Sequence, residues 1–102
     1  MILFKWNKHE GYLKHVANYA NGQPCIRFHV AGEPFPIATV TVNVPDADVP
    51  EGHILVRGWS NNAGIPAALA AQGIAERIST APTGYEEATL MKLLHSIEDF
   101  KL

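Results

Sequence analysis

The chain has almost no cysteine, no excess of basic charge and no long apolar run, and each shortage excludes a class of protein. Its one cysteine, Cys25, cannot form an internal disulfide, so the fold does not require an oxidising compartment. Eight Lys and Arg residues against ten Asp and Glu give a net charge of −2, which argues against a surface that follows a phosphate backbone. The apolar start at residues 1–4 is too short for a signal peptide, and no window approaches the roughly 20 apolar residues of a membrane span. We expect a cytoplasmic protein with no membrane partner.

The spacings that define metal centres, nucleophilic sites and phosphate-binding loops are also missing. Cys25 and His29 share an expected strand face, but four strand residues span roughly 13 Å, too far for a nucleophile and its base. The glycines do not have the spacing of a dinucleotide fingerprint or a P-loop. We therefore expect no cofactor, no metal and no enzymatic activity. The chain has five histidines, none of which pairs with another at the i, i+4 spacing of a zinc enzyme: His9, His15, His29, His53 and His95. An enzyme whose site is assembled from distant histidines stays open as a further hypothesis, besides the two binding functions described below.

Hydrophobic alternation is the strongest signal that the first half of the chain contains. The 102 residues, 47% of them hydrophobic, suit one domain over residues 1–102. In the clearest run, residues 36–44, alternate apolar residues point inward, whereas Thr39, Thr41 and Asn43 are expected to face solvent. The same period predicts strands at 2–6, 12–20 and 25–30, with a type I′ turn at Asn21-Gly22, so the first half is expected to form a four-stranded meander.

The second half is expected to add further strands. Residues 53–57 suit a fifth strand, and residues 87–95 favour a last strand over a short helix. The segment 75–80 is ambiguous. The tail at 96–102 is expected to fray.

One helix is expected between these strands. Asn61 or Asn62 can cap its start, because a side-chain oxygen can accept from a free N–H of the first turn, and Gly73 suits the residue after its end. Ile65 and Leu69 lie on one side and would dock on the sheet. The sequence therefore predicts an α+β fold: an antiparallel sheet of five to six strands, beginning as an N-terminal meander, with one short helix packed on a face.

Aromatic, arginine and acidic side chains gather in the expected loops around the helix. Arg57 and Trp59 precede it, and these residue types anchor protein interfaces most often. Trp59 could instead fill the gap between sheet and helix, which is the simpler interpretation. Three acids in the loop 45–52 fit a solvated loop better than a cation site, because the glycine turn and distal glutamate of a calcium loop are absent. We predict a partner-binding surface in loop 45–52 and segment 57–62, joined by a residue after the Pro82–Gly84 turn: Asp46, Asp48, Glu51, Arg57, Trp59, Asn61, Asn62 and Tyr85.

A small basic and aromatic strip near the N-terminus supports an alternative function. Lys5, Lys8 and Lys14 lie close in the sequence to Trp6 and Tyr12. Stacking on aromatic rings together with cationic contacts is how single nucleic-acid strands are held. Single-stranded nucleic-acid binding is therefore the alternative, although nucleic acid is the less expected partner.

A string of strand and turn residues across roughly 35–94 resembles the signature of a known family. Its parts are the Ala38–Pro45 run, the acidic loop and the strand after it, Trp59-Ser60-Asn61-Asn62-Ala63-Gly64, the alanine-rich helix, Gly73-Ile74 and Pro82-Thr83-Gly84-Tyr85. The family comprises small proteins of unknown function from phages, plasmids and integrative elements. Where the family carries acidic residues around Asn61-Asn62 and an aromatic or charged helix, this chain is neutral and rich in alanine.

The resemblance implies a setting rather than a mechanism, since the family has no assigned functional residues. Mobile elements carry many small proteins that block host defences by occupying a surface, anti-CRISPR proteins among them. The resemblance thus implies a phage or mobile-element accessory protein that binds and inhibits a host protein, such as a CRISPR-type defence complex, in the bacterial cytoplasm. An exposed edge strand also allows self-pairing, so both a monomer and a homodimer stay open.

Overall fold

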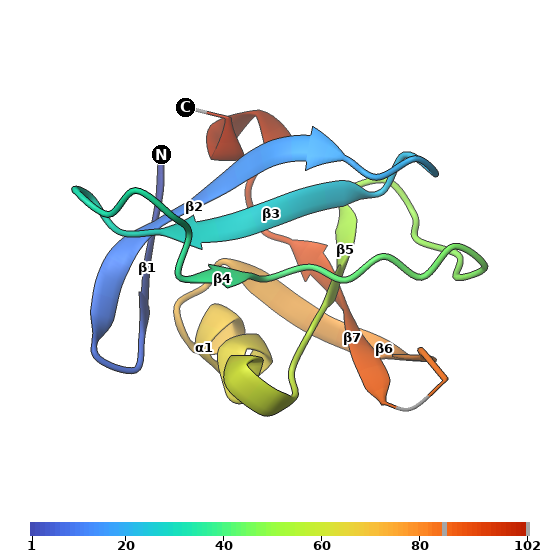
Figure 1. Cartoon of the computed structure of the whole chain (residues 1–102). Helices are drawn as coiled ribbons and strands as arrows, with labels where there is room; N and C mark the ends of the chain where they lie inside the picture. The colour runs from blue at the N-terminus through green and yellow to red at the C-terminus, as the bar shows by residue number, and fades with distance from the viewer. Residues whose placement is uncertain (85, 102) are drawn as a thin grey trace.

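The computed structural model describes residues 1–84 and 86–101 and has an α+β architecture (Figure 1). The described strands form two antiparallel sheets, one of four strands in the order β1-β2-β3-β4 and one of three in the order β5-β7-β6. The prediction of one sheet with five to six strands is therefore wrong, although the α+β class and the antiparallel pairing are confirmed. The elements are β1 Ile2–Trp6, β2 His9–Asn18, β3 Pro24–His29, β4 Ala38–Thr39, β5 His53–Val56, η1 Ser60–Asn62, α1 Ile65–Ala71, β6 Ala75–Pro82, β7 Glu87–Leu93 and η2 Ile97–Phe100.

Alternation of apolar residues explains the four-stranded sheet. Ile2, Leu13 and Phe28 stand opposite one another on β1, β2 and β3, and all three are buried. The predicted four-stranded meander is confirmed. The turn at Asn21-Gly22 differs from type I′, because Gly22 has a positive φ of 88° and Asn21 does not.

The predicted strand at 36–44 is interrupted because the chain changes its partner strand there. Only two of its residues pair with β3 as β4, and the Val42 N–H then donates to the Leu55 carbonyl oxygen of β5 at 3.0 Å. Thr41, expected to face solvent, is 3% exposed, and its Oγ1 accepts a hydrogen bond from the Ile26 N–H at 3.0 Å. This segment joins the two sheets, and Thr41 belongs to the joint rather than to a wet face.

Helix α1 begins later than predicted and has no side-chain cap. Gly64 is its N-cap residue, with a φ of 91°. Asn62 is buried, and its Nδ2 donates to the Thr39 carbonyl oxygen at 2.7 Å. The expectation that Asn61 or Asn62 caps the helix is therefore wrong, since Asn62 ties the segment before the helix to the joint between the sheets.

Helix α1 contacts both outer strands, β1 and β6 (Figure 1). Ile65 and Leu69 are buried in the core, as predicted. Beyond its last turn, Gln72 substitutes for a neighbouring strand: its Oε1 accepts from the Lys5 N–H at 3.0 Å, and its Nε2 donates to the Lys5 carbonyl oxygen at 2.7 Å. Because unpaired strand edges can pair with other chains, this side chain protects β1 at Lys5.

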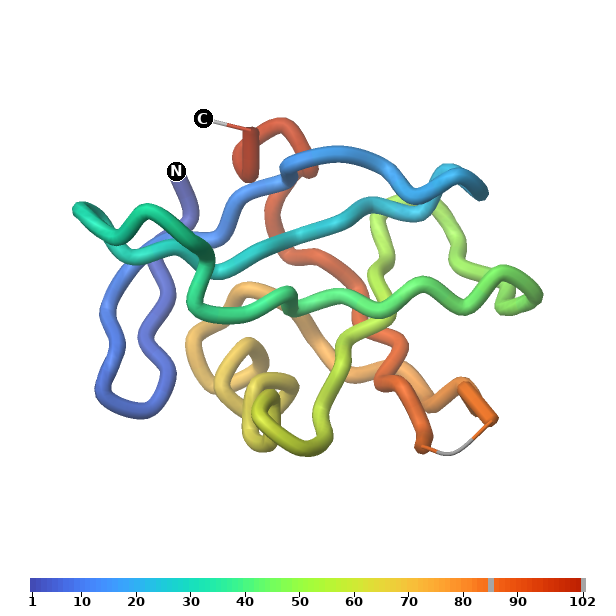
Figure 2. Tube along the Cα trace, viewed as in Figure 1, coloured from blue at the N-terminus to red at the C-terminus, as the bar shows by residue number. Residues whose placement is uncertain are grey.

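Residues from both sheets, α1 and η2 form one hydrophobic cluster. The C-terminal segment runs back to β2 (Figure 2), and Phe100 of η2 is completely buried in that cluster. The expectation that the tail frays is therefore wrong for the part of it that forms η2. The ambiguous segment 75–80 lies within β6, and the preference for a strand at 87–95 is confirmed by β7. Within residues 1–84 and 86–101, no helix is long and apolar enough to cross a membrane.

Candidate functional site

Trp59 lies at an open hollow rather than in the core. Its side chain is half-buried and is not part of the hydrophobic cluster that the described residues form. The guanidinium carbon of Arg57 lies 5.4 Å from the centroid of its ring, which is a cation–π contact. Trp59, Pro82 and Glu86 line the hollow, whose volume is about 480 Å³. This placement favours an accessible anchor over a side chain that fills the gap between sheet and helix.

Four carboxylates lie around the same end of the molecule. Asp46 and Asp48 are exposed and line a second hollow of about 330 Å³, and Pro82 at the end of β6 lines both hollows. Glu86 precedes β7, Glu87 is its first residue, and both are exposed. The ion pairs found among the described residues lie elsewhere and include none of the four. We call this surface the acidic end, and it consists of Asp46, Asp48, Trp59, Glu86 and Glu87.

The other predicted contact residues lie in different surroundings. Asn61 is exposed and follows Trp59 by two residues in the sequence. Asn62 is only 5% exposed and its amide is held by the backbone of the joint, so we correct the expectation that it faces a partner. Glu51 is exposed but lines a separate pocket. Tyr85 lies outside the described residues.

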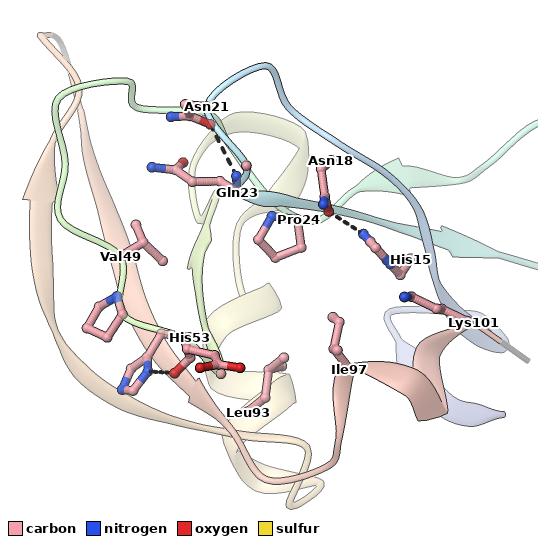
Figure 3. A pocket seen from close by; sticks show the side chains of 14 residues that line it. His15, Asn18, Asn21, Gln23, Pro24, Val49, His53, Leu93, Ile97 and Lys101 are labelled. Carbon is pink, nitrogen blue, oxygen red and sulfur yellow. Dashed lines mark hydrogen bonds between the residues drawn. The ribbon is translucent and has the colours of Figure 1, made fainter.

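The pocket beside Glu51 lies between the β2–β3 turn, the loop before β5 and η2, and has a volume of about 330 Å³ (Figure 3). On one wall, His15 points toward Asn18, with Nε2 2.7 Å from Oδ1. Across the pocket, Nδ1 of His53 lies 2.9 Å from the Glu51 carbonyl oxygen. Each histidine is thus held within its own segment, and among the described residues no three His, Cys, Asp or Glu side chains converge as metal ligands. Local sequence patterns did not reveal this pocket, because its walls come from three distant segments.

The outer face of the four-stranded sheet carries a second group, in which Tyr12 and Lys14 of the expected strip stand beside Leu3, Arg27 and His29, three residues that sequence reasoning missed. Tyr12 of β2 stands opposite His29 of β3, and their rings are stacked with centroids 5.6 Å apart and planes at 15°. The next pair on this face is Lys14 opposite Arg27, and both are exposed. Burial lowers the pKa of His29, and the neighbouring charges of Lys14 and Arg27 lower it further. We call this surface the sheet face, and it consists of Leu3, Tyr12, Lys14, Arg27 and His29.

The basic and aromatic strip expected near the N-terminus is not one surface. Trp6 packs against the core from the inner side of β1, and its Nε1 donates to the Ala63 carbonyl oxygen at 3.3 Å. Lys5 lies on the opposite side of that strand, with Nζ 3.5 Å from a Glu10 carboxylate oxygen. Of the other strip residues, Tyr12 and Lys14 belong to the sheet face, whereas Lys8 lies in the β1–β2 turn.

Comparison of the chain with family models, with curated proteins and with solved structures finds no match.

Proposed function

We propose that this chain is a non-enzymatic accessory protein that binds a host protein through the acidic end and thereby inhibits it. The observation that carries this proposal is the position of Trp59, half-buried at an open hollow beside carboxylates that no described cation pairs with. In the mobile-element setting that the sequence resemblance implies, the target is a defence complex of the CRISPR type.

The acidic end has the composition of a contact surface for a basic protein. A tryptophan buries a large area when a partner covers it, and the cation–π contact with Arg57 restrains its ring before binding, which lowers the entropy lost on association. The surrounding carboxylates attract a positively charged partner and orient its approach. A protein surface that binds nucleic acid has this basic character, so occupation of such a surface would block it.

Co-elution of the purified chain with candidate defence complexes tests the proposal. Trp59→Ala should weaken a complex by at least about ten-fold, the effect typical of an interface anchor. Asp46→Lys combined with Asp48→Lys should also weaken the complex, and the loss of affinity should be larger at low salt than at high salt. Phe35→Ala is the matched control, because Phe35 is 76% exposed and lies outside the acidic end. Unchanged binding by the Trp59 variant would remove the acidic end from the proposal, and persistent failure to find a protein partner would overturn the function itself.

A further inference from the structure

The charges of this chain are segregated along the sequence. Residues 1–39 contain four Lys and Arg residues against two acids, whereas residues 40–102 contain four against eight. The net charge of −2 is thus the sum of a basic segment that forms the four-stranded sheet and an acidic remainder. The average charge of the chain therefore does not describe the outer face of that sheet.

On the sheet face, the two cations have no acidic partner among the described residues. Lys14 and Arg27 are exposed and opposite each other, and the ion pairs of the described chain involve neither. Glu10, the acid on the same strand, is held by Lys5. Besides burial, the positive charges of Lys14 and Arg27 lower the pKa of His29, as expected where no nearby anion balances them. This face therefore fits an anionic occupant.

Aromatic and apolar groups stand directly beside these cations. Tyr12 and His29 lie two residues along their strands from Lys14 and Arg27, a separation of about 7 Å, which is comparable to the separation of a base from its phosphate. Tyr12 has His29 of β3 on one side and Leu3 of β1 on the other. Leu3 is 73% exposed. A hollow of about 340 Å³, which Leu3 and Tyr12 help to line, opens there.

We propose that the sheet face binds single-stranded nucleic acid, with a base against Tyr12 and the hollow beside it and with phosphates at Lys14 and Arg27. Stacking on an aromatic ring next to a cationic track is how single strands are bound without a strong sequence preference. A purely acidic chain such as polyglutamate would satisfy the cations but would leave the ring pair and the apolar hollow without a matching group. The sheet face and the acidic end consist of different residues, so this proposal can fail while the proposed function holds.

Fluorescence anisotropy with a labelled oligothymidylate of about 12 nucleotides tests the proposal. The logarithm of the association constant should fall against the logarithm of the salt concentration with a slope of about −1.4, the value for two phosphate contacts on a single strand. Lys14→Glu combined with Arg27→Glu should abolish binding at low salt. Tyr12→Ala should weaken binding about ten-fold, and Tyr12→Phe should retain it.

The matched control is Arg77→Glu combined with Lys92→Glu, which changes the net charge equally on the exposed surface of the three-stranded sheet. This control should bind as the unchanged chain does, and thermal melting should show that every variant is folded. Equal loss of binding in the control, or absence of binding at the lowest salt, would overturn the proposal. Equally tight binding of polyglutamate of the same charge would also overturn it, because the face would then recognise acidic chains in general.

Discussion

The sheet face and the acidic end stand on the same hydrophobic core but carry opposite charge and are held in different ways. The sheet face lies on a regular ladder, where the strand register places Tyr12 opposite His29 and Lys14 opposite Arg27. The acidic end is assembled from separate connections around Trp59, and a hydrogen bond from Asn62 to the Thr39 carbonyl oxygen ties down the segment that follows Trp59. A small chain can thus present two distinct binding chemistries, and its average composition describes neither.

The largest effect should follow a change in the core beneath both surfaces. Phe28 is completely buried and meets Phe4 edge to face, with ring centroids 5.2 Å apart. Phe28→Ala should lower the free energy of unfolding by about 3–5 kcal/mol, because the lost contacts leave a cavity. Urea denaturation measures this loss, and Phe35→Ala should change the value by less than about 0.5 kcal/mol. A second transition that survives the Phe28 change would show that the two surfaces stand on separately folding units and would break the comparison.

A smaller effect should be confined to the support of the acidic end. Asn62→Ala removes the hydrogen bond to the Thr39 carbonyl oxygen and leaves a part-buried acceptor without this partner, which should cost about 1 kcal/mol. Its neighbour Asn61 is exposed, so Asn61→Ala should cost less than about 0.5 kcal/mol. Oligothymidylate binding by the folded Asn62 variant should be unchanged, because the sheet face does not contain this residue. If the two asparagine variants were equally stable, the amide would not hold the segment beside Trp59.

The smallest effect should be a change in the pH dependence of stability, which His29 of the sheet face causes. Its surroundings hold the pKa of His29 below the ordinary value of 6.5, so the unfolded chain binds a proton there more readily than the folded chain. This group therefore lowers stability as the pH falls from above 6.5 through the depressed pKa. His29→Gln should reduce the difference in Tm between pH about 7.5 and pH about 5. A His29 variant with an unchanged pH dependence would contradict the assigned surroundings.

Local patterns predicted those parts of the fold in which one strand keeps one partner. The alternation that buries Ile2, Leu13 and Phe28 follows directly from a strand with one covered face, so the meander could be found in the sequence. The alternation through Thr41 looks the same, but there the chain leaves β3 for β5, and the Ile26 N–H needs a buried acceptor. A change of partner strand has no local signature, because it depends on where two distant segments meet.

The ends of elements and the candidate surfaces were harder to predict for the same reason. Asn62 has the side chain of a good helix cap, yet the Thr39 carbonyl oxygen, 23 residues away in sequence, binds it. Phe100 is an isolated aromatic in a polar tail, and no periodicity indicates that it is buried. The Tyr12–His29 pair depends on the register of β2 and β3, which includes an irregularity between His15 and Ala17.

The pairing of Gln72 with the Lys5 backbone has a consequence for how the molecule could fail. The carboxamide of Gln72 alone completes the hydrogen bonding of the Lys5 backbone on β1. A strand from another chain could form more backbone hydrogen bonds along this edge and would compete with the glutamine. Fraying of the last turn of α1 would release Gln72 and expose the Lys5 backbone groups. Leu3, two residues earlier on the same strand, is already largely exposed to water. Without Gln72, the Lys5 N–H and carbonyl oxygen would lose these partners, and β1 would present an edge that can pair with a strand of another chain.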